Sequence, residues 1–268
     1  MLKLIKYEFI KKSKLLLILL ISAILANIGL VLAYGTEVIL IFLSVAPVIL
    51  VVLYLFELIM TYSEDLNKKT GYMLFMTPNS GYKILGSKLI TIFLEGILLL
   101  TSYFIFSVVN LSVMAYKKAG DFSFIGDAMR EIVDAFNKLL SGTLGINIGD
   151  LGLIFILLLT VSIIFVLTVY TAITIRKSIF SNAKFGGVLS FIIFVILNIV
   201  YGKLADLIGH IFNFQNVAVT TQISANVAVS YPSAHMFKIF TVLIIFNCIT
   251  ASILMLCSGY LIEKKINL

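Results

Sequence analysis

The sequence has few charged residues. Charged side chains make up 12% of its 268 residues and hydrophobic side chains make up 61%. Soluble domains average about 25% charged and about 45–50% apolar residues. An ordinary soluble domain is therefore excluded, and the apolar excess requires the hydrocarbon interior of a membrane. The net charge of +7 comes from short basic clusters between apolar runs, a pattern that suits lipid headgroups and not nucleic acid.

Cysteine and histidine are also scarce. Cys248 and Cys257 lie in the last apolar run and are interpreted as small apolar helix residues, not as a disulfide or metal ligands. His210 and His235 are far apart, and no H-E-x-x-H or G-x-S-x-G pattern occurs. The sequence thus predicts no metal centre and no catalytic residues.

A nucleotide site is also missing. The segment from Gly81 to Lys88 superficially matches a phosphate-binding loop, but Ser87 precedes Lys88, which reverses the required G-K-[ST] order. The chain is therefore not expected to be an enzyme. Any ATP-driven work would need ATP bound by a separate subunit.

Six apolar runs are long enough to cross a membrane as helices, for which about 20 residues suffice. The runs are Leu15–Tyr34, Val38–Tyr62, Leu89–Val113, Leu151–Ile175, Phe185–Gly202 and Ile239–Ile262. No polar segment between them is long enough to fold separately. The sequence predicts an all-α membrane protein, with residues 1–268 forming one transmembrane domain.

The basic residues predict the orientation of these spans. Most lysine and arginine residues fall on the side that carries the N-terminus, in four clusters: Lys3–Lys14, Lys68–Lys88, Arg176–Lys184 and Lys264–Lys265. Basic residues gather on the cytoplasmic side of a membrane. With an even number of spans, both termini are expected in the cytoplasm.

Three segments outside the spans have patterns of their own. Met1–Lys14 has a partial apolar stripe, which predicts a helix lying in the inner headgroup layer; a plain basic tail is the alternative. Phe122–Leu140 follows the amphipathic helical spacing and predicts a helix on the outer surface, between spans three and four. Lys203–Lys238 is predicted to be irregular, either an ordinary loop or a segment dipping into the membrane edge.

Two carboxylates lie inside the predicted spans, Glu57 in the second and Glu95 in the third. A charge at membrane depth costs on the order of 2.5–3.5 kcal/mol, so it calls for a partner or a function. Both residues are near the predicted cytoplasmic ends of their spans. Structural pairing with a basic residue such as Lys88 and a role in transport or gating both remain open.

The segment between spans two and three, Tyr62–Lys88, is the most informative. Acidic and basic residues come first, at Glu64, Asp65, Lys68 and Lys69. A short apolar stretch follows, Tyr72–Met76, and Thr77 and Pro78 end it. A short apolar piece held at the cytoplasmic surface by flanking charges is typical of a surface that docks onto another protein.

Along nearly its whole length the chain resembles the permease subunits of ABC-2-type ATP-binding-cassette exporters. The resemblance includes the basic N-terminal segment, the six spans and the irregular segment before the last span. Within the loop it is carried by Glu64, Thr70-Gly71-Tyr72, Thr77-Pro78 and Tyr82–Lys88.

This resemblance implies a bacterial plasma-membrane protein in which two permeases, identical or paralogous, form a dimer. Each would contact a cytoplasmic subunit that binds ATP and Mg²⁺. The residues implied in that contact are Glu64, Asp65, Thr70, Gly71, Tyr72, Met73, Phe75 and Pro78. The cargo does not follow from the resemblance.

Two other classes of function remain. A secondary carrier or channel would use Glu57 or Glu95 as its ion site, but neither an inverted repeat nor a matching pair of broken helices is evident. A membrane enzyme or sensory scaffold is disfavoured because no catalytic constellation is found.

Overall fold

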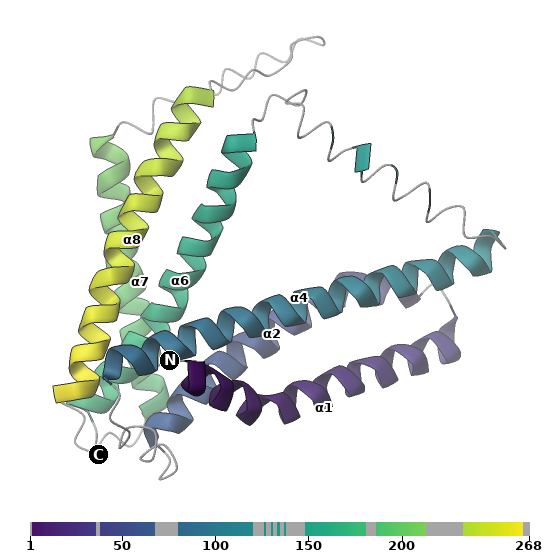
Figure 1. Ribbon diagram of the computed structural model, residues 1–268, viewed down its shortest axis with the longest axis horizontal. Coiled ribbons are helices and arrows are strands. Elements are labelled where there is room, and N and C mark those ends of the chain that lie inside the picture. Colours follow the sequence, from purple (N-terminus) through teal and green to yellow (C-terminus); the bar gives the residue numbers. More distant parts are fainter. Residues whose placement is uncertain are drawn as a thin grey trace. The chain divides into compact units, whose positions relative to one another are not determined.

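The computed structural model describes six long segments of the chain, and all the secondary structure in them is helical (Figure 1). The described residues are 2–35, 38–67, 80–119, 148–180, 186–212 and 233–264, together with the separate positions 126, 130, 133, 134 and 137.

The helices confirm the prediction of six spans. They are α1 (Leu2–Tyr34), α2 (Val38–Asn67), α4 (Gly81–Ala119), α6 (Ile148–Ile179), α7 (Gly186–Ile211) and α8 (Ser233–Lys264). Each contains a stretch that is long and apolar enough to cross a membrane. At a rise of 1.5 Å per residue, the 39 residues of α4 extend about 58 Å, well beyond a hydrocarbon core of about 30 Å.

The helices are longer than the apolar runs predicted. Residues 2–14 form one unbroken helix with the first span, and whether they lie in the headgroup layer stays a prediction. Glu64 and Asp65, predicted to be in a loop, belong to the last turns of α2. Of the segment Lys203–Lys238, predicted to be irregular, residues 203–211 instead continue α7 and residues 233–238 begin α8. Polar residues mark where an apolar run stops, but they do not end a helix. Most of Phe122–Leu140 lies outside the described residues.

The chain divides into two compact units. Unit 1 comprises Met1–Glu64 and Lys83–Val133, and therefore holds α1, most of α2 and most of α4. Unit 2 comprises Asp65–Tyr82 and Asp134–Leu268, and holds α6, α7 and α8.

In unit 1, α1 and α4 run in the same direction. Lys12 contacts Glu95 and Asn27 contacts Asn110, and in both pairs the partners are 83 residues apart in sequence. Because these two separations are equal, α1 and α4 lie parallel between the two contacts, and Figure 1 shows their common direction. Helix α2 runs antiparallel to α4, since the Tyr54 hydroxyl donates to the carbonyl of Ile92 while the hydroxyl of Tyr103, farther along α4, donates to that of Leu43, nearer the start of α2.

In unit 2, α6 packs against both α7 and α8. The hydroxyl groups of Thr171 and Ser258 share a buried hydrogen bond of 2.8 Å between α6 and α8. On α8, Asn247 accepts a hydrogen bond from Tyr201 of α7 and donates one to Thr160 of α6. Side-chain hydrogen bonds of this kind join helices where burial of apolar surface offers no driving force, as in lipid.

Large apolar side chains cover the outer surfaces of both units. Leu100 and Phe104 in unit 1 are 70% and 65% exposed, and Phe155 and Phe191 in unit 2 are 63% and 65% exposed. Apolar surface this extensive is typical of protein in contact with lipid or with another subunit. The architecture is therefore that of a multi-pass membrane protein.

Candidate functional site

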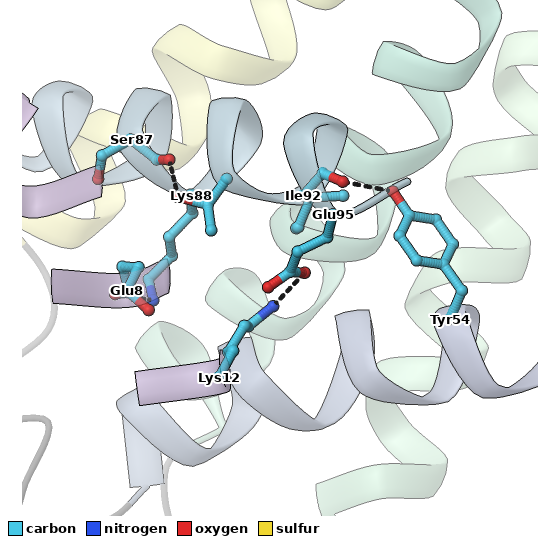
Figure 2. Close-up of polar contacts among 8 residues, drawn as sticks. Glu8, Lys12, Tyr54, Ser87, Lys88, Ile92 and Glu95 are labelled. Atoms are coloured by element: carbon cyan, nitrogen blue, oxygen red, sulfur yellow. Dashed lines mark hydrogen bonds and ion pairs between the residues drawn. The ribbon is translucent and has the colours of Figure 1, made fainter. Parts of the chain in front are cut away.

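Two buried ion pairs join the N-terminal part of α1 to the first part of α4 (Figure 2). The Lys88 ammonium contacts Glu8 Oε1 at 2.8 Å, and the Lys12 ammonium contacts Glu95 Oε2 at 2.8 Å. No side chain among the four is more than 7% exposed. These residues are called the ion-pair ladder below.

The ladder alternates in charge. On α1 an acid, Glu8, is followed one turn later by a base, Lys12; on α4 a base, Lys88, is followed two turns later by an acid, Glu95. If α1 shifted along α4 so that Glu8 faced Glu95, or Lys12 faced Lys88, like charges would lie opposite each other. The ladder therefore fixes the register of α1 on α4 as well as holding the helices together.

The sequence left open whether the two span carboxylates are structurally paired or act in transport, and the ladder identifies an ionic partner for one of them. Glu95 is structurally paired, but its partner is Lys12 and not Lys88, which pairs with Glu8. Sequence reasoning missed Glu8 and Lys12 as site residues because the first 14 residues were expected to lie on the membrane surface. The one available signal was the spacing of an acid and a base one turn apart in an otherwise basic segment.

The second span carboxylate, Glu57, has a different environment. It makes no ion pair or hydrogen bond within the described part of the chain, and it lines a cavity of about 560 Å³ between α1, α2 and α4. The cavity walls are otherwise mainly apolar, including Leu20, Leu50 and Leu99. Among the described residues that line the cavity, Glu57 is the only charged one. The structure thus separates the two carboxylates that sequence reasoning treated alike.

The predicted partner-coupling residues are described only in part. Glu64 and Asp65 lie at the end of α2, where Asp65 is buried together with its neighbours Tyr62 and Leu66. The rest of the set lies outside the described residues: Thr70, Gly71, Tyr72, Met73, Phe75 and Pro78.

The far side of this loop is anchored in unit 2. The backbone N–H of Gly81, the first residue of α4, donates to Glu263 Oε1 of α8 at 2.8 Å. Next to it, Gly259 of α8 lies so close to the ring of Tyr82 that a Cβ atom has no room. The start of α4 is therefore a firmly held position at the C-terminal edge of the loop.

No group of three or more His, Cys, Asp or Glu side chains is arranged to hold a metal ion in the described segments. Cys248 and Cys257 are both exposed on α8 as free thiols. The site geometry therefore consists of the ladder, the cavity beside it and the anchored ends of the loop. Comparison of the chain with protein-family models, curated proteins and solved structures finds no match.

Proposed function

We propose that this chain is the membrane-spanning permease subunit of an ATP-binding-cassette exporter. Two copies, or one copy and a paralogue, form the translocation path in a bacterial plasma membrane with both termini in the cytoplasm. A separate cytoplasmic subunit binds ATP with Mg²⁺ and hydrolyses it. The ABC-2 resemblance of the sequence between Glu64 and Lys88 is the origin of the proposal.

The observation that best supports it is how the ends of the loop are fastened. After the loop, α4 begins with an anchor to Glu263 and, within two further turns, enters the ion-pair ladder at Lys88. Before the loop, α2 ends in the buried residues Tyr62, Asp65 and Leu66. A force applied to residues 68–79 is therefore transmitted to α2 and α4.

The mechanism follows from this fastening. ATP draws the two cytoplasmic subunits together, and their movement displaces the loop and the start of α4. Because the ladder ties α4 to α1, the two helices move as one element. The ATP-bound state favours one arrangement of the helices and the ATP-free state the other, so differential ATP affinity drives the transition.

Co-purification tests the proposal. The chain is co-expressed with a protein that carries G-x-x-x-x-G-K-[ST] and is encoded beside it, and the complex is isolated in mild detergent. Met73→Asp with Phe75→Asp should release the partner and lower ATP hydrolysis to the partner's own level. The matched control, Phe122→Asp with Phe124→Asp, puts the same change in the segment predicted on the opposite side and should retain the partner. Retention of partner and full ATPase activity by the Met73/Phe75 variant would contradict the proposal.

One observation favours a second candidate, a secondary carrier. Glu57 is a carboxylate without an ionic partner in the described part of the chain, inside a mainly apolar cavity, as an ion-coupling site requires. Vesicles containing this chain alone distinguish the candidates. Transport driven by a pH gradient and abolished by Glu57→Gln would establish the carrier and exclude the exporter.

A further inference from the structure

The cavity of unit 1 has the shape of a site for a long molecule. Its lining on α2 extends from Ile41 to Glu57, which is about 24 Å of helix. Glu57 is at one extreme of this length, and side chains of α1 and α4 close the other walls. Several lining residues, such as Ile41 and Ile49, are more than half exposed, so the cavity opens on the apolar outer surface of the unit.

The polar groups that line the cavity differ in whether they already have a hydrogen-bond partner. The hydroxyl groups of Tyr54, Ser102 and Tyr103 already donate to backbone carbonyls, of Ile92, Leu98 and Leu43 respectively. Glu57 has no such partner in the described segments. A ligand entering the cavity therefore meets apolar walls along its length and one unsatisfied carboxylate at its end.

Tyr54 and Glu57 lie at the same end of the cavity. They are three residues apart on α2, so they share one face of the helix. A carboxylate next to an aromatic ring is the combination that attracts a quaternary or protonated amine, through charge and through the ring face. Among the described lining residues at this end, none offers a free hydrogen-bond donor by which an anionic or neutral head group could replace its water, whereas a cation meets the carboxylate of Glu57.

The size of the cavity is that of a small-molecule site. The cavity has a volume of about 560 Å³. A volume of about 300–1,000 Å³ is usual for small-molecule sites.

We propose that this cavity binds a single-chain amphiphile with a positively charged head group, the head at Glu57 and Tyr54 and the chain along the wall formed by Val45, Ile49 and Leu53. The ligand enters sideways from the lipid phase through the open side. As a binding site this stands without the proposed function; that the amphiphile is the exported cargo rests on the proposed function.

The test is equilibrium binding of radiolabelled dodecyltrimethylammonium to the purified full-length chain in phosphatidylcholine nanodiscs, with empty nanodiscs as the background. The wild-type chain should bind saturably, and unlabelled dodecanol should compete poorly. Glu57→Gln, which keeps the shape and removes the charge, should weaken binding by at least about tenfold. Asp206→Asn, which removes an exposed carboxylate from α7 in unit 2, is the matched control and should leave binding unchanged.

A second variant locates the site independently of charge. Ala46→Phe fills the cavity wall and should abolish binding while helical content, followed by circular dichroism, is retained. Equal binding by wild type and Glu57→Gln, full competition by dodecanol, or unchanged binding by Ala46→Phe would each overturn the proposal.

The two proposals fail separately. Saturable, Glu57-dependent binding by a chain that recruits no ATP-binding subunit would leave the site standing and remove the exporter. An ATPase complex that forms normally but binds the probe no better than empty nanodiscs would support the exporter and overturn the binding site. When both hold, the probe should stimulate ATP hydrolysis by the complex, and Glu57→Gln should remove that stimulation.

Discussion

Breaking the Lys12–Glu95 pair should destabilise unit 1 strongly, and exchanging its charges should not. Glu95→Gln leaves the Lys12 ammonium without its counter-ion, at 7% side-chain exposure. Removing one partner from a buried pair costs about 3–5 kcal/mol, because the remaining charge is buried and uncompensated. Lys12→Met should cost a similar amount, since it leaves the Glu95 carboxylate in that position.

The exchanged variant, Lys12→Glu with Glu95→Lys, restores the pair with its polarity reversed. It loses the alternation of the ladder, because Glu8 then has an acid one turn away and Lys88 has a base two turns away. Like charges at that spacing on a helix cost a few tenths of a kcal/mol. The exchange should therefore recover all but about 1 kcal/mol of the loss caused by either single change.

The assay is thermal unfolding of the purified chain in one detergent, with the two single variants and the exchanged variant forming a double-mutant cycle. A coupling energy above about 2 kcal/mol is expected. An exchanged variant as unstable as the worse single variant would refute the reasoning. Because charges near a span influence insertion, each variant's topology is first checked by thiol labelling of a cysteine introduced at the exposed position Leu2.

Three further predictions concern other positions. Asn110→Leu removes the hydrogen bond that the side-chain amide of Asn27 on α1 donates to Asn110. The change should lower the free energy of unfolding by about 0.5–1.5 kcal/mol in the same assay. Gly259→Ala should cost about 1–3 kcal/mol, because the new methyl group meets the ring of Tyr82, and the cost should shrink in a Tyr82→Ala background. A cysteine at Leu94 should react with a membrane-impermeant maleimide added to one side of the membrane, whereas one at Phe104, farther along α4, should not; equal protection of both would contradict the placing of Leu94 near the charged pairs at the edge of the apolar run of α1.

The number and order of the helices could be predicted because lipid imposes a length. A helix that crosses hydrocarbon needs about 20 apolar residues, and each of the six runs meets that requirement by composition alone. The ends of the helices could not be predicted in the same way. The polar residues Glu64, Asp65 and Lys203 end apolar runs in the sequence. The helices continue past them, because no helix-breaking residue interrupts the backbone hydrogen bonds there.

The site was harder to predict for a different reason. Glu8 and Lys88 are 80 residues apart, and nothing in the pattern of either segment identifies its partner. The cavity is invisible in one dimension because an apolar side chain facing a void and one facing lipid are chemically the same. Only the charge of Glu57 distinguished that end of α2, and charge alone did not tell it from Glu95.

The parallel register of α1 and α4 explains why Glu95 is tolerated where it is. With partners 83 residues apart, Leu16, where the apolar run of α1 begins, is level on α4 with Leu99, which lies inside the run Leu89–Val113. Glu95 is therefore level with Lys12, one turn before the apolar run of α1 begins. The cost of an unpaired carboxylate at membrane depth does not apply to Glu95, because Lys12 pairs with it at the edge of the apolar run of α1. Tyr54 reaches the same level through Ile92, so Glu57, one turn beyond it on α2, lies near the level of these charged pairs, and its cavity extends from there along the apolar run of α1.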